Sequence, residues 1–225
     1  MQYQIEGGSL PCLVISLNPG EKLISEVGGR TWSKGEIETE TTSNGGAGKA
    51  LGRLLTGESL FMSTYTAQGP AEIVFTSSFP GRIVAMELQA GQSVIAQKSA
   101  FLCASYGVQL SAYVNKSAKT GFLGGEGFIM QKITGPGLAF FEIDGYCKEY
   151  DLQAGERVVC DTGVMALMDE TCSMEVQTVK GLKNKLLGGE GIFDTVLVGP
   201  GKVYLQTMTV SKLASLLIPY LPLKK

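Results

Sequence analysis

Histidine is absent from the 225 residues of this chain. Without histidine, no Ser-His or Cys-His pair can activate a nucleophile, and the most common side-chain ligand of zinc is missing. An enzyme built from this sequence would have to rely on carboxylates, lysines, tyrosines or cysteines. We therefore expect a protein that is not an enzyme and that holds no cofactor and no metal.

Cysteine is scarce, and no two cysteines have the CxxC spacing of a metal or redox site. The residues are Cys12, Cys103, Cys147, Cys160 and Cys172. Isolated cysteines of this kind are typical of small buried hydrophobes in a reducing compartment. The sequence also lacks a basic leader, and no segment approaches the roughly 20 apolar residues of a membrane span. These features predict a cytoplasmic protein.

Charge and tryptophan are also limited. The formal net charge is −2, which gives no overall attraction toward nucleic acid. The one tryptophan, Trp32, is expected to anchor a core or an interface rather than to stack on a ligand. Any anion site would depend on a local cluster of basic residues.

Two short motifs each occur three times along the chain. A Gly-Glu pair within an apolar context lies at 56–61, 124–129 and 188–193, and each copy precedes a Gly-Pro turn, at 69–71, 135–137 and 199–201. A Leu-x-x-Gly-Glu/Gln motif lies at 17–21, 88–92 and 152–156. Self-similarity at a fixed period indicates a repeat architecture. We predict three internal repeats, at about 1–78, 79–145 and 146–209, within one compact body over 1–225 that has pseudo-threefold symmetry.

Short apolar runs recur every 8 to 12 residues or so, with turn signals between them, which is the pattern of β-sandwiches and closed β structures. The predicted strands cover 3–5, 12–15, 22–27, 37–42, 59–66, 72–76, 82–88, 93–97, 100–105, 108–114, 128–134, 138–143, 157–160, 164–168, 174–179, 192–198 and 203–209. The fold class is therefore all-β.

The last segment has a different pattern. Val210, Leu213, Leu216 and Leu217 have helical spacing, and Ser211 is placed to cap the start of a helix over 210–222. We expect the apolar side of this helix to pack on the β structure. The alternative is a helix that contacts a protein partner or the surface of a membrane.

Three glutamates occupy equivalent positions in the Gly-Glu motif: Glu58, Glu126 and Glu190. Around a pseudo-threefold axis they would face one another, and such a ring would bind a cation or raise the pKa of some of its members. The alternative, which we favour, is that each carboxylate accepts hydrogen bonds from the backbone of its own turn.

A basic connector precedes each Gly-Glu motif. Its residues include Lys49, Arg53, Lys119, Lys183 and Lys185. Gathered on one face, they would bind a phosphate-bearing small molecule, an anionic lipid or another polyanion. Aromatic residues are not interleaved among them apart from Phe122, which disfavours nucleic acid. A solvated basic surface without a ligand is the simpler interpretation.

The repeated Leu-x-x-Gly-Glu, the Gly-Pro-Gly turns and the closing segment over 213–222 resemble the bacterial branch of the altered-inheritance-of-mitochondria family, number twenty-four. The likeness covers essentially the whole chain. It implies a β fold similar to the tryptophan RNA-binding attenuation protein, duplicated within one chain. Its mitochondrial members look like factors of inner-membrane organisation, and the resemblance brings no catalytic residues to this sequence.

These observations favour a non-catalytic scaffold or binding protein that forms a homo-oligomer. The alternative is a binding module for a phosphate-bearing ligand or polyanion on the basic connectors. The sequence identifies no particular protein partner.

Overall fold

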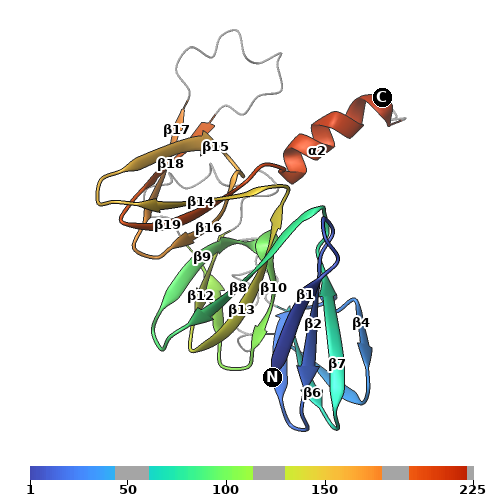
Figure 1. The fold of residues 1–225 in the computed structure, drawn as a ribbon. Coiled ribbons are helices and arrows are strands. Elements are labelled where there is room, and N and C mark those ends of the chain that lie inside the picture. The colour runs from blue at the N-terminus through green and yellow to red at the C-terminus, as the bar shows by residue number, and fades with distance from the viewer. Residues whose placement is uncertain (44–60, 114–129, 179–192, 222–225) are drawn as a thin grey trace. The chain divides into compact units, whose positions relative to one another are not determined.

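The computed structural model describes residues 1–43, 61–113, 130–178 and 193–221, and these form an all-β protein with one short α-helix near the C-terminus (Figure 1). The predicted fold class is confirmed. In chain order the strands are β1 (Gln2–Glu6), β2 (Cys12–Leu17), β3 (Lys22–Glu26), β4 (Trp32–Lys34), β5 (Ile37–Ser43), β6 (Phe61–Ala67), β7 (Ala71–Thr76), β8 (Gly81–Leu88), β9 (Ser93–Gln97), β10 (Phe101–Ser105), β11 (Gln109–Ala112), β12 (Met130–Thr134), β13 (Gly137–Asp144), β14 (Cys147–Leu152), β15 (Arg157–Asp161), β16 (Met165–Asp169), β17 (Ser173–Thr178), β18 (Phe193–Val198) and β19 (Gly201–Gln206). The helical elements are η1 (Lys98–Ala100), α2 (Val210–Leu217) and η3 (Ile218–Tyr220).

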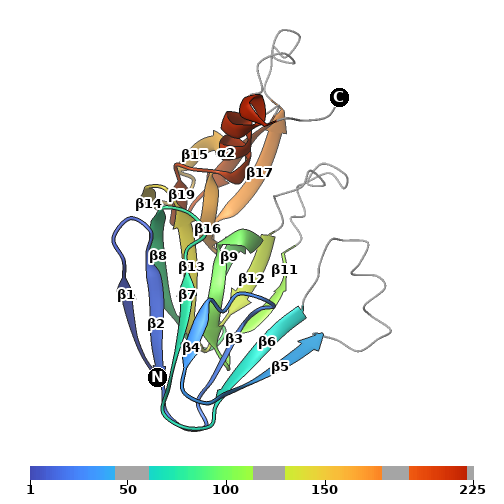
Figure 2. The same ribbon diagram turned by 90° about the vertical axis from the view of Figure 1, so that its right-hand side faces the viewer.

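The strands form four sheets, which we name A to D in chain order. Sheet A has the strand order β1-β2-β7-β4, and sheet B has β5-β6-β3-β10-β13-β8 (Figure 2). Sheet C has β11-β12-β9-β16-β19-β14, and sheet D has β15-β18-β17. Every strand pair whose register is resolved is antiparallel.

The same pattern of strand pairing occurs three times along the chain. In the first set β2 pairs with β7, in the second β8 pairs with β13, and in the third β14 pairs with β19. Likewise β3, β9 and β15 each pair with the strand that leads into a Gly-Pro turn, namely β6, β12 and β18. Two further pairings, β3 with β10 and β9 with β16, connect one set of strands to the next. The Leu-x-x-Gly and Gly-Pro motifs therefore fall at corresponding places in the pairing pattern, while the Gly-Glu motif lies outside the described residues and the arrangement of the repeats about a common axis stays a prediction.

By their contacts the residues group into two compact units, each with its own core. The first unit contains Met1–Gln92, Phe101–Ala112 and Ile133–Glu142, and the second contains Ser93–Ala100, Tyr113–Lys132 and Ile143–Lys225. Alternation in β2 buries every second side chain, Leu13, Ile15 and Leu17, in the core of the first unit. The core of the second unit is rich in methionine, a flexible side chain that fills irregular space.

Two strands were not predicted from the sequence. One is β4, which has only three residues. The other is β14, in which four of six residues are exposed, so that it lacks the apolar alternation of a half-buried strand. Both were missed because their backbone pairs with a neighbour although their side chains carry little apolar signal.

The C-terminal helix differs from the prediction in two ways. Its N-cap is Thr209, whose hydroxyl accepts a hydrogen bond from the N–H of Lys212, rather than Ser211. The helix has no buried residue, so the expected packing of its apolar side on the β structure is wrong. The alternative, in which the helix contacts a protein partner or a membrane surface, stays a prediction.

Candidate binding surface

The site residues proposed from the sequence all lie outside the described residues. These are Glu58, Glu126 and Glu190 of the Gly-Glu motif and Lys49, Arg53, Lys119, Lys183 and Lys185 of the basic connectors. Whether the carboxylates or the basic residues converge therefore stays a prediction, as does binding of a phosphate-bearing ligand.

The Leu-x-x-Gly-Glu/Gln motif forms the same turn in all three copies. The side-chain oxygen of the last residue accepts a hydrogen bond from the backbone N–H three positions earlier, at 2.8, 3.0 and 2.9 Å for Glu21, Gln92 and Glu156. The glycine before each of them has a positive φ, between 80° and 83°. A glutamine serves the second copy as well as a glutamate serves the others, so the motif is structural and does not require a charge.

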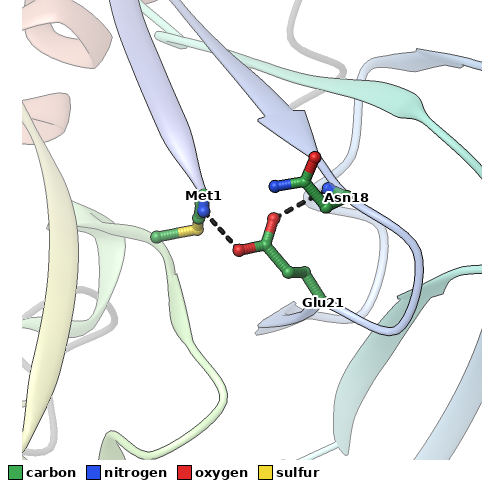
Figure 3. Close-up of polar contacts among 3 residues, drawn as sticks. All are labelled: Met1, Asn18 and Glu21. Atoms are coloured by element: carbon green, nitrogen blue, oxygen red, sulfur yellow. Dashed lines mark hydrogen bonds and ion pairs between the residues drawn. The ribbon is translucent and has the colours of Figure 1, made fainter.

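Glu21 has one additional partner, the N-terminal ammonium of Met1 (Figure 3). The hydrogen bond from this ammonium, followed by that from the N–H of Asn18, lowers the pKa of the Glu21 carboxyl, while partial burial opposes the shift. A carboxyl whose pKa is lower in the folded than in the unfolded state stabilises the fold above its unfolded pKa. That contribution is lost as the pH falls through the folded pKa.

Glu21→Gln should therefore lower stability at neutral pH, by an amount that shrinks as the pH falls below the unfolded pKa of the carboxyl. The amide keeps the bond to the N–H of Asn18, as Gln92 does, and loses only the ion pair. Because the side chain is 31% exposed, solvent screening limits the loss to about 0.2–1 kcal/mol. Thermal unfolding of both proteins, with no residues before Met1, would be compared near neutral pH and near pH 3. A difference that did not become smaller at the lower pH would contradict the ion pair as its cause.

The cysteines behave as the sequence suggested for three of the five: Cys103, Cys147 and Cys172 are buried. Burial raises the pKa of the Cys103 thiol, and burial followed by neighbouring carboxylates raises the pKa of Cys160 and of Cys172 to about 11. Such thiols are protonated at neutral pH, and the protonated form is a poor nucleophile and metal ligand. Within the described ranges, no group of three or more Cys, Asp or Glu residues is arranged to hold a metal ion.

A groove of about 510 Å³ lies on sheet A. A row of directly opposed residues crosses it from β1 to β4: Gln2, Ser16, Glu72 and Lys34. Because the carboxylate of Glu72 is on the strand next to Lys34, the charges of this row offset each other. The groove therefore offers hydrogen bonds and does not favour an anion.

The outer strands of sheets A and D expose large apolar side chains. In β4, which ends sheet A, Trp32 is 49% exposed, so a core position for this tryptophan is wrong and an interface position stays open. In β15, which ends sheet D, Val159 is 60% exposed. An unpaired strand edge with exposed apolar residues is a template for pairing with another strand. We take β4 and β15 as the candidate binding surface.

The fold and these features define an all-β protein built from recurring antiparallel strand pairs, in which the terminal strands β4 and β15 carry exposed apolar side chains. The chain belongs to the mitochondrial biogenesis AIM24 family, whose model matches residues 3–208. It is 26% identical over 230 residues to an uncharacterized protein of Streptococcus pyogenes serotype M6, covering 99% of this chain and 92% of that one.

A crystal structure of a Streptococcus pyogenes protein has the same fold, with a TM-score of 0.78 and 21% identity over 98% of this chain and 99% of that one. The predicted family is confirmed. In the part of the chain that the structure describes, no helix has the length and apolar character needed to cross a membrane.

Proposed function

We propose that this protein is a non-catalytic scaffold or binding protein of the cytoplasm and that it works by associating with itself. The observation that supports this best is the exposure of Trp32 and Val159 on the terminal strands of sheets A and D. Aromatic residues are enriched at protein interfaces, and Trp32 is an exposed residue of this kind.

The use of the polar side chains supports the same proposal. The carboxylate of Glu142 accepts hydrogen bonds from the backbone N–H and the hydroxyl of Ser78. The buried amide of Gln206 donates to Gln97, and both amides donate to the carbonyl of Gly163. These groups, which other proteins use for catalysis, here satisfy the backbone and one another.

Self-association makes a direct prediction for the purified protein. Its mass in solution should exceed the 23.9 kDa of one chain and should fall toward that value on dilution, because association follows mass action. Light scattering coupled to size-exclusion chromatography, over a dilution series, measures this.

A single mass equal to that of one chain at every concentration would contradict the proposal. Robust turnover of a substrate in an activity screen would contradict its non-catalytic part. These two results are independent, so that either half of the proposal can fail alone.

A further inference from the structure

The two connections between successive sets of strands have the same register. One connection is β3 with β10 in the first unit, and the other is β9 with β16 in the second. The opposed pairs are Leu23 with Ser105 and Ile24 with Ala104 in the first connection, and Val94 with Asp169 and Ile95 with Met168 in the second. Since Leu23 and Val94 hold the same place after the Leu-x-x-Gly motif, one rule of pairing describes both connections.

Among the described strands, this rule leaves β15 and β4 without the corresponding partner, and these two strands form the candidate binding surface. Val158 and Val159 of β15 follow the third Leu-x-x-Gly motif as Leu23 and Ile24 follow the first. In β4, Ser33 lies opposite Ile73, the third residue of β7, as Ala104 and Met168 lie opposite the third residues of β13 and β19. Strand β15 therefore corresponds to β3 and β9, and β4 corresponds to β10 and β16.

We propose that β15 of one molecule pairs antiparallel with β4 of a second copy of this chain, with Val159 directly opposite Ser33. This inference rests on the self-association proposed above and specifies its interface. The joined strands would have the order β17-β18-β15-β4-β7-β2, which corresponds strand by strand to sheets B and C. Sheets A and D are thus the two halves of a third sheet of the same kind, with β1 added at its edge.

Burial at the corresponding positions supports the pairing. Ile95, which corresponds to Val159, is 1% exposed, whereas Val159 is 60% exposed. Cys103 and Leu167, which correspond to Trp32, are fully buried. The positions that a neighbouring strand covers within the chain are therefore the positions at which β4 and β15 expose apolar side chains, and covering them is favourable by the usual hydrophobic term.

In this register charges of opposite sign would be diagonal neighbours at both strand ends, and one like-charged pair, Glu36 with Glu156, would be directly opposed. Asp161 would lie opposite Thr31 and beside Arg30, while Arg157 would lie opposite Gly35 and beside Glu36. Opposite charges that are close across an antiparallel pair favour one register over its neighbours. Because the two edges differ, the contact is head-to-tail, so that successive copies form a closed ring or an extended chain.

Disulfide crosslinking between two single variants tests the register directly. Ser33→Cys and Val159→Cys would each be made in a Cys160→Ala background, since alanine already occupies the corresponding position in β9. Mixed and oxidised with copper phenanthroline, the two variants should give a covalent dimer, because directly opposed strand residues have Cβ atoms about 4.5–5.5 Å apart. Each variant alone should give none. Lys34→Cys mixed with Val159→Cys should also give none, because a shift of one residue turns the side chains to opposite faces.

The other outcomes are equally informative. A dimer from Val159→Cys alone would show that β15 pairs with itself. A third chain that carries both Ser33→Cys and Val159→Cys tests closure within one molecule, which a crosslink in that chain and in no mixture would show. Either result overturns the proposal. A second variant, Val159→Glu, should reduce the apparent association constant at least tenfold while its circular dichroism spectrum stays that of the wild type. If the wild type associates and neither crosslinking nor Val159→Glu has the expected effect, the interface is wrong and the proposed self-association stands. If the wild type is monomeric, both fail.

Discussion

Phe140→Ala should lower the free energy of unfolding by about 3–5 kcal/mol. Phe140 is fully buried on β13 in the core of the first unit, where it lies opposite Cys103 of β10. Its ring also meets that of Tyr3 edge-on, with centroids 4.9 Å apart. Truncation removes this apolar surface and leaves a cavity between strands that cannot close fully. Urea unfolding followed by circular dichroism measures the loss.

The matched control is Tyr106→Ala, which removes an aromatic ring three residues after Cys103, the residue of β10 that pairs with Phe140. Tyr106 is 59% exposed and its ring lies 5.3 Å from the ammonium of Lys22, so that its loss should cost under about 1 kcal/mol. Equal losses in the two variants would contradict the position given to Phe140. A loss confined to Phe140→Ala would also show that sheet B, which contains the β3–β10 connection, depends on this core.

Much of the β structure could be predicted because its signal is local. The predicted 93–97 coincides with β9, and most other predicted strands differ from the observed ones by one or two residues at an end. Apolar alternation and glycine turns specify these segments without help from distant residues. The failures, β4 and β14, are strands whose pairing is decided by neighbours far along the chain.

Trp32 shows why exposure was harder to predict than strand position. A single large aromatic residue is more often buried than not, and its positional equivalents Cys103 and Leu167 are indeed buried. Trp32 is exposed because no strand of the described chain lies on the outer side of β4. The residue type carries no information about which repeat ends a sheet. The same limit applies to the helix α2, whose apolar spacing was recognised but whose exposure could not be inferred.

The sequence showed that the Leu-x-x-Gly and Gly-Pro motifs both recur, but not that they contact each other. In the structure the two turns are in contact. The glycine of the second Gly-Pro turn, Gly135, packs against the backbone carbonyls of Leu88 and Gln89 in the Leu-x-x-Gly turn. Its N–H also donates to the carbonyl of Gln92 at 3.0 Å. In the third repeat, Gly199 has the same neighbours in Leu152 and Gln153. In the second and third repeats the Leu-x-x-Gly turn and the Gly-Pro turn therefore pack against each other.

Gly135→Ala should destabilise the protein by about 1–3 kcal/mol, and Gly199→Ala by a similar amount. A Cβ on Gly135 would lie 2.5 Å from two backbone oxygens, a separation that requires the backbone to move. The first repeat supplies the control, because a Cβ on Gly69 would have no atom within 4 Å. Gly69→Ala should therefore be neutral to within about 0.5 kcal/mol. Thermal and urea unfolding of the three variants gives the comparison.

The reason for the difference lies in two additional residues of the first repeat. There, the residue that exchanges hydrogen bonds with the Leu-x-x-Gly turn is Ala67: it donates to the carbonyl of Glu21 at 3.1 Å and accepts from the N–H of Gly20 at 2.8 Å. Gln68 and Gly69 follow it before the proline, so that the close approach made by Gly135 and Gly199 falls on a residue that tolerates a Cβ. If Gly69→Ala cost as much as Gly135→Ala, steric contact would not be the cause, and the glycines would be required for turn conformation alone. A large loss at 135 and 199 with none at 69 would instead show that the same two motifs dock in two geometries within one chain.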